Sequence, residues 1–363
     1  MNLKKFMLRL LFLLPIPLGV GLVNVMEDPA NVFHPETVPS QVAAILLSGR
    51  QVLGPKNYDE RLFNRDYSRG CAARFDVLVM GSSRSMQIDQ GMFPGRRVHN
   101  IAVSGAVVED YLGLYEMYGP KLVPAGTVVL GLDPWILNAQ HGQVRWRSIR
   151  EEVDRQRELL HLPIPASFLD SPQWARLEHV VSLGYFQESL RAHWEKSVKP
   201  VVPTDQTAGE DIIRLTDGSL VYGRALREAT EESVENHVRL YVSGKAMYSL
   251  EGYTELDGRA EQALEALVSH LRQQGKSVIL FLPPYHPLTY ARLREAPRYH
   301  NVREAERWFR DLGARNACAV LGSFDPGACG FTSGDFYDEM HAKKDALARI
   351  LAAASPGPTI GCR

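Results

Sequence analysis

Short apolar runs that end in small residues or proline are the feature that most constrains how this chain folds. In each run, β-branched and other apolar side chains follow one another without the polar alternation of a strand that faces water. Such runs are typical of strands buried on both faces of a parallel sheet. We therefore predict buried parallel strands within residues 75–83, 96–105, 126–134, 276–284 and 317–322.

Helical patterns alternate with these runs. Residues 257–275 carry an apolar stripe at helical spacing, and Gly275 stands where the helix is expected to stop. Strand and helix alternate at short spacing, which predicts an α/β fold with a parallel sheet. The expected helices of the core lie within residues 107–119, 257–275, 302–313 and 342–354.

Residues 136–250 interrupt this alternation within an α/β domain that we assign to residues 75–354. Charged helical stretches occur there, for example at residues 147–160. Asp217-Gly218 separates two alternating runs, as a hairpin turn does. We expect a mostly helical insertion that lies over the ligand-binding edge of the sheet.

The N-terminus reads as a membrane signal. Basic residues precede an apolar run from Leu10 to Met26, which is near the lower limit for a spanning helix and contains two prolines. No small-x-small cleavage site follows, so we expect residues 1–27 to be an uncleaved anchor. A cleaved signal peptide and a buried core helix are the alternatives. Either membrane interpretation places the main domain in the periplasm or outside the cell.

Two further segments flank the predicted domain. Residues 28–74 are rich in proline and glycine, which favours a stalk and lead-in. Residues 355–363 are expected to form a C-terminal tail.

The charge balance excludes one class of partner. The chain has 41 basic and 42 acidic side chains and a formal charge of −1. Because no basic field is available to hold phosphates, we expect no nucleic-acid partner. The cysteine and histidine spacings match no zinc pattern, and we expect neither a metal nor a cofactor.

Four cysteines agree with an oxidising compartment. Cys318 and Cys329 flank a turn-rich stretch, which predicts a local disulfide. Cys71 and Cys362 either form a second bridge or remain reduced.

The strongest chemical signal is a serine directly after the first predicted strand. Gly81-Ser82-Ser83-Arg84 stands at the carboxyl end of that strand, the edge where open parallel sheets bind ligands. Serine needs a base to take its proton, and the base works best when a third group fixes its tautomer. Asp338 and His341, in a D-x-x-H loop before the last helix, supply that pair.

The order of these motifs resembles the SGNH (GDSL-like) hydrolase superfamily: GSS first, then N-x-x-x-S-G, and D-x-x-H near the end. The resemblance covers residues 75–134 and 276–354. It implies a three-layer α/β/α, flavodoxin-like parallel sheet with a catalytic triad of Ser83, Asp338 and His341. It also implies that the backbone N–H groups of Ser83 and Gly105 bind the oxyanion.

One block departs from the family pattern. Where the family carries an asparagine as a further oxyanion donor, this chain reads Gly131-Leu132-Asp133-Pro134. An ionised Asp133 would repel an oxyanion. Asn138 is the nearest asparagine that follows.

Three residues near the motifs have open roles. His286 follows a strand and is a rival base, a cleft residue or a packing residue. Arg84 either forms a local salt bridge or binds an anionic group of the substrate. Together with Asp133, these residues form a weak set of expected substrate contacts.

The motifs GSSR, GLDP and FYD-x-x-H resemble most the membrane-anchored branch of the superfamily, which is linked to exopolysaccharide acetylation and to D-alanyl transfer onto teichoic acids. The resemblance implies ester hydrolysis or O-acyl transfer on a cell-envelope or extracellular polysaccharide, with a membrane-bound acyl-transfer protein as a possible partner. The alternative is a catalytically weak glycan-binding or assembly protein with the same fold.

Overall fold

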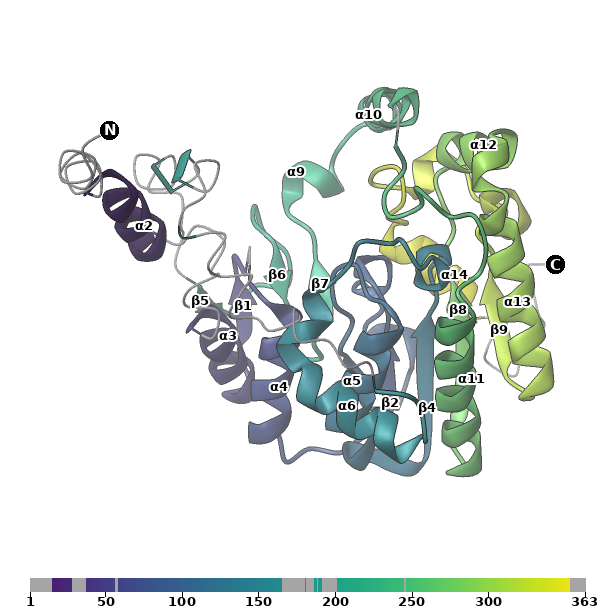
Figure 1. The fold of residues 1–363 in the computed structure, drawn as a ribbon, viewed down its shortest axis with the longest axis horizontal. Coiled ribbons are helices and arrows are strands. Elements are labelled where there is room, and N and C mark those ends of the chain that lie inside the picture. Colours follow the sequence, from purple (N-terminus) through teal and green to yellow (C-terminus); the bar gives the residue numbers. More distant parts are fainter. Residues whose placement is uncertain are drawn as a thin grey trace, which may run out of the picture.

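The computed structural model describes residues 15–27, 37–55, 58–164, 180, 186–187, 189–190, 201–244 and 246–352. Its centre is a sheet of five parallel strands in the order β3-β2-β4-β8-β9 (Figure 1). The predicted α/β fold with a parallel sheet is confirmed. The strands are β2 (Phe75–Met80), β3 (Val98–Asn100), β4 (Leu122–Gly131), β8 (Ser277–Leu282) and β9 (Ala319–Gly322).

The strand order determines where a ligand can bind. Counted along the chain within this sheet, the order is 2-1-3-4-5, a doubly wound arrangement that reverses direction between its first and third strands. Here these strands are β2 and β4. Loops that leave the carboxyl ends of neighbouring strands in opposite directions open a crevice at this point, so the loops after β2 and β4 are the expected binding loops.

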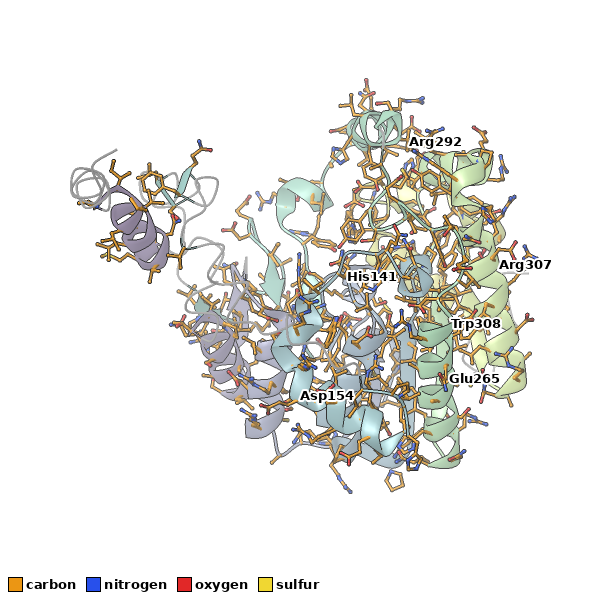
Figure 2. The ribbon with its side chains drawn as sticks, in the orientation of Figure 1. His141, Asp154, Glu265, Arg292, Arg307 and Trp308 are labelled. Carbon is orange, nitrogen blue, oxygen red and sulfur yellow. The ribbon has the colours of Figure 1, made fainter. Side chains whose placement is uncertain are left out.

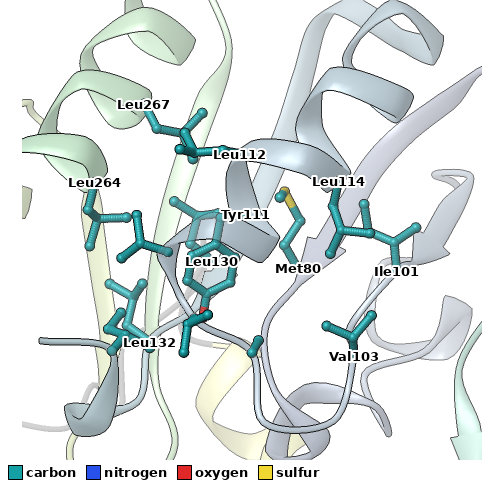
Figure 3. Packing of buried hydrophobic residues seen from close by; sticks show 14 of the residues in the cluster. Met80, Ile101, Val103, Tyr111, Leu112, Leu114, Leu130, Leu132, Leu264 and Leu267 are labelled. Atoms are coloured by element: carbon teal, nitrogen blue, oxygen red, sulfur yellow. The ribbon is translucent and has the colours of Figure 1, made fainter. Parts of the chain in front are cut away.

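Each face of the sheet has its own apolar core. Leu78 and Met80 of β2 belong to one core, and Val77 and Val79, which alternate with them, belong to the other. In Figure 3, Tyr111 and Leu267 of the covering helices pack over the first face. That face is covered by α5 (Val108–Tyr118), α11 (Gly258–Gln273) and α13 (Asn301–Arg315), and the opposite face by α14 (Lys344–Ala352).

The segment expected to be a stalk is folded where the structure describes it. It forms α3 (Thr37–Leu47), β1 (Gln51–Leu53) and α4 (Glu60–Gly70), and Leu46, Phe63 and Tyr67 lie in the first core. The Asp59 side chain accepts hydrogen bonds from the N–H groups that begin α4. The stalk prediction is therefore wrong for residues 37–55 and 58–74, because α4 has an amphipathic pattern that the surrounding glycines and prolines obscured. Residues 28–36 lie outside the described part.

The insertion is more mixed than predicted. Its described part contains α6 (Arg150–Leu159), α9 (Arg224–Arg227) and α10 (Glu231–Ser243), together with β5 (Val202–Thr204), β6 (Ile213–Arg214) and β7 (Leu220–Val221). The predicted turn at Asp217-Gly218 does join an antiparallel pair, β6 and β7. These strands form a second sheet, in the order β5-β1-β6-β7, so the lead-in supplies a strand to the insertion.

The N-terminal segment forms α2 (Pro15–Glu27), a helix of 13 residues. Within the part of the chain that the structure describes, no helix combines the length and apolar character needed to cross a membrane. The first 14 residues of the expected anchor and the tail at 355–363 lie outside the described residues.

The predicted disulfide between Cys318 and Cys329 is wrong. Cys318 has a free thiol and packs against the first core, whereas Cys329 packs against the second. Sequence spacing does not show that β9 separates these two cysteines onto opposite faces of the sheet. Cys71 is also a free thiol, and Cys362 lies outside the described residues.

We expect Cys318→Ser to change the free energy of unfolding by less than about 1 kcal/mol, because no covalent link is lost. Loss of a disulfide would lower it by about 2 to 5 kcal/mol. Urea unfolding of the full-length chain without reductant measures the difference. Alkylation of the denatured, unreduced chain followed by mass spectrometry should find Cys318 modified, and a peptide linked to Cys329 would contradict this arrangement.

Candidate active site

Ser83 stands at the carboxyl end of β2, at the point where the strand order reverses. It begins a short 3₁₀ turn, Ser83–Ser85, in which the Ser82 side chain accepts a hydrogen bond from the Arg84 N–H at 3.2 Å. A Cβ at Gly81 would lie 2.6 Å from the Ser85 hydroxyl and 3.1 Å from the Gly131 carbonyl. Only glycine therefore allows the turn that leaves the Ser83 side chain partly exposed above the sheet.

The structure brings Ser83, His341 and Asp338 into one hydrogen-bonded chain. Ser83 Oγ lies 2.8 Å from His341 Nε2, although the two residues are 258 positions apart. On the other side of the imidazole, His341 Nδ1 lies 2.8 Å from Asp338 Oδ2 and 3.0 Å from Oδ1. A proton on Nδ1 satisfies the carboxylate and leaves Nε2 to accept the serine proton.

The surroundings of Asp338 keep its carboxylate charged. Burial acts to raise its pKa, but the His341 imidazole and the backbone N–H groups of Met340 and His341 lower it by more, and the net shift is downward. The two N–H groups donate to Asp338 Oδ1 at 2.9 and 2.8 Å. Asp338 is therefore anionic at neutral pH and is held in place by its own loop.

Gly105 is positioned by two helices below the site. It lies in the left-handed region with φ 59°, and in the described part neither its N–H nor that of Ser83 has a protein acceptor. The buried pair of Arg61 and Asp110 joins α4 to α5 through N–O distances of 2.7 and 2.9 Å. Arg61 also donates to the Ser104 carbonyl at 3.0 Å, which fixes the loop that carries Gly105.

Arg84 and Asp133 form a salt bridge in the interior. The Arg84 Nη1 to Asp133 Oδ1 distance is 2.8 Å, and neither side chain is exposed. Arg84 also donates to the carbonyls of Met340 and Pro283 at 3.0 and 2.5 Å, and its guanidinium lies 4.0 Å from the centre of the Tyr285 ring. The substrate-binding role considered for Arg84 and Asp133 is therefore wrong, because both side chains are fully buried in a local salt bridge. Burial raises the pKa of Asp133, and Arg84 opposes this shift.

His286 and Asn138 also have structural positions. His286 is buried at the start of α12 (Pro287–Glu295), where its Nδ1 accepts the Leu288 N–H at 3.2 Å. Burial lowers its pKa to about 4, so it is neutral, and no contact joins it to Ser83. It is neither the base nor an accessible substrate contact. Asn138 donates to the carbonyls of Ser249 and Glu251 instead of facing Gly105.

Three residues of the insertion lie beside the site without a signal in the sequence. The Tyr222 ring, which follows β7, meets the His341 ring edge to face with centres 6.0 Å apart. A Cβ built on Gly105 would lie 2.7 Å from the Tyr248 hydroxyl and 2.9 Å from Gln143 Oε1. Figure 2 shows His141, two positions before Gln143, above Asp154 of α6, toward the carboxyl ends of the central strands.

No family model matches this chain, and no curated protein sequence is significantly similar to it. Within the described ranges, no cluster of three or more histidine, cysteine, aspartate or glutamate side chains is arranged to hold a metal ion. The functional assignment therefore depends on the geometry of the site and on the resemblance of its motifs.

We expect Asp133→Asn to destabilise the protein and to reduce any esterase activity, because it leaves the Arg84 guanidinium buried without a counter-charge. The loss in the free energy of unfolding should be about 3 to 5 kcal/mol. Asp205→Asn, which breaks an exposed pair with Arg50, is the matched control and should cost less than about 1 kcal/mol. An Asp133→Asn variant as stable as wild type would contradict the structural role of this buried pair.

Asp338→Asn and Glu339→Gln should give opposite pH dependences of stability. The lowered pKa of Asp338 means that its carboxylate stabilises the fold above the ordinary value of 3.8 and that this contribution is lost as the pH falls. Burial and the neighbouring Asp338 raise the pKa of Glu339 above 4.5, so wild type loses stability relative to Glu339→Gln as the pH rises. His237, 3.3 Å from Glu339, reduces the second effect. Urea unfolding of wild type and both variants across the acidic pH range measures how each difference in the free energy of unfolding changes with pH. Changes of the same sign for the two variants would contradict these environments.

Proposed function

We propose that this chain is a serine-dependent ester hydrolase or O-acyltransferase of the SGNH type. The observation that carries the proposal is the continuous hydrogen-bonded chain from Ser83 through His341 to the Asp338 carboxylate. These three residues lie at the strand-order reversal of a doubly wound sheet, beside two backbone N–H groups without protein acceptors in the described part. Acyl transfer needs these parts together: a nucleophile, an oriented base and oxyanion donors.

The geometry supports a reaction in two halves. Ser83 Oγ attacks the ester carbonyl while its proton passes to His341 Nε2, and the backbone N–H groups of Ser83 and Gly105 stabilise the oxyanion. The intermediate collapses, the C–O bond to the alcohol breaks, and His341 gives that alcohol its proton. Water or a sugar hydroxyl then attacks the acyl-serine, loses its proton to His341 and releases Ser83.

We propose a cell-envelope or extracellular polysaccharide as the acceptor or ester substrate. The motifs shared with the membrane-anchored branch support this choice, as does the basic and apolar N-terminus, which favours a periplasmic or external location. A membrane-bound acyl-transfer protein is then the natural acyl donor. The Tyr222 ring, which meets the His341 ring edge to face, places an aromatic side chain next to the base of the triad.

A catalytically weak glycan-binding or assembly protein is the second candidate. One observation favours it: the position of the family asparagine is occupied by Asp133, which is sequestered in the interior with Arg84. In this case the fold would keep its triad while the oxyanion site lacks a donor.

Hydrolysis of p-nitrophenyl acetate by the purified full-length chain separates the two candidates. We expect Ser83→Ala and His341→Ala to lower kcat/KM by roughly 10³-fold or more, because each removes a member of one proton-transfer unit. Ser85→Ala is the matched control: the Ser85 hydroxyl is buried two residues away without a hydrogen-bond partner, and its loss should change activity less than about twofold. A wild-type activity that survives Ser83→Ala would eliminate the triad, and an inactive wild type would favour the binding protein.

A further inference from the structure

The proposed oxyanion site lacks the side-chain donor that an asparagine supplies in the SGNH motif. The residue aligned with the family asparagine, Asp133, contacts Arg84 in the interior, and Asn138 binds the carbonyls of residues 249 and 251. Backbone N–H groups of Ser83 and Gly105 are then the only oxyanion donors assigned so far within the described chain. A third donor, if present, must come from another element.

The hydroxyl of Tyr248 lies directly against Gly105. A Cβ at Gly105 would be 2.7 Å from this hydroxyl, so glycine is required for the approach as well as for its φ of 59°. Tyr248 is 40% exposed, which keeps it within reach of a bound substrate. Its position combines contact with an expected oxyanion donor and access from outside.

Contacts to both sides hold Tyr248 in this position. Its backbone N–H donates to the Tyr241 hydroxyl at 2.8 Å. Its ring packs edge to face on Trp135 with centres 5.5 Å apart, and Trp135 Nε1 donates to the Ala106 carbonyl at 3.1 Å. Because Ala106 follows Gly105, the same network fixes the tyrosine and the glycine relative to each other.

The hydroxyl proton of Tyr248 remains available to donate a hydrogen bond to a bound substrate. Both hydrogens of the Gln143 side-chain amide are used, one on the Tyr248 hydroxyl at 3.0 Å and one on the Ser249 hydroxyl at 2.9 Å. Tyr248 therefore accepts from Gln143, and no described residue accepts its own O–H. A phenol that accepts one hydrogen bond becomes a better donor in the next.

We propose that Tyr248 is the third oxyanion-hole donor and that Gln143 is its positioning residue. This inference rests on the proposed acyl-transfer function. When Ser83 attacks, the carbonyl oxygen gains negative charge, and the Tyr248 O–H donates a hydrogen bond to it without giving up the proton. The catalytic core thus takes one donor from the insertion in place of the asparagine that it lacks.

Labelling of Ser83 by an alkyl fluorophosphonate tests this role in the full-length chain. Ser83 Oγ bonds to phosphorus, fluoride leaves, the serine proton passes to His341, and the phosphoryl oxygen occupies the oxyanion site. We expect Tyr248→Phe to slow labelling roughly 10- to 100-fold, the order of effect of one oxyanion donor. Tyr253→Phe is the matched control, because that hydroxyl lies buried in the same segment without a partner, and its rate should equal that of wild type.

Gln143→Leu tests the positioning role separately. Without the amide that donates to its hydroxyl, Tyr248 is no longer held in place beside Gly105, so labelling should slow toward the rate of Tyr248→Phe. Combining the two changes should add no further loss, since both remove one hydrogen bond. Additive losses would overturn the assignment of Gln143.

The outcomes distinguish this inference from the function on which it rests. If wild type is labelled at Ser83 and Tyr248→Phe reacts at the same rate, only the role of Tyr248 is overturned. If wild type is not labelled and behaves like Ser83→Ala, the proposed function fails and this inference fails with it. Slow labelling in Tyr248→Phe with a normal rate in Tyr253→Phe supports both.

Discussion

The guanidinium of Arg84 lies in the interior between the carboxyl ends of the central strands, and the site depends on this placement. It bonds to Asp133 after β4, to the Pro283 carbonyl after β8 and to the Met340 carbonyl in the loop of the triad. A buried ion is expensive to desolvate and is tolerated only when its hydrogen bonds are made. Arg84 meets this condition by tying together three loops that are far apart in sequence, directly beside Ser83.

This arrangement accounts for an aspartate at position 133, where the SGNH motif that the chain resembles carries an asparagine. An asparagine there could face an oxyanion but could not neutralise Arg84, whereas the aspartate neutralises it and is withdrawn from the surface. The loop that carries Asp338 and His341 is held in position, because Met340, whose carbonyl accepts a hydrogen bond from Arg84, lies between them. Under the proposed function, electrostatic support for the loop and donation to the oxyanion are thus divided between different residues.

The strands, the core helices and the hairpin could be predicted because each depends on local periodicity. Ser83, Asp338 and His341 could be located because parallel strands deliver their carboxyl ends to one edge. The disulfide prediction failed because spacing along the chain does not tell which face of β9 a cysteine occupies. The role of Arg84 stayed open because its burial is a property of the assembled loops. Tyr248 carried no signal at all, since its distance from Gly105 exists only after the insertion folds.

The origin of the residues around the site separates two tasks. The central sheet and its loops supply Ser83, Gly105, Asp338 and His341, whereas Tyr222 and Tyr248 come from the insertion. In the proposed reaction, Ser83, His341 and Asp338 carry proton transfer and Gly105 donates to the oxyanion, and these requirements are the same for every ester. The insertion residues flank the imidazole and the proposed oxyanion site, so under the proposed function we expect changes in the insertion to alter both the choice of substrate and the rate of attack. Under the proposed function, the insertion, whose structure is the least predictable from the sequence, adjusts the chemistry of residues whose positions are predictable.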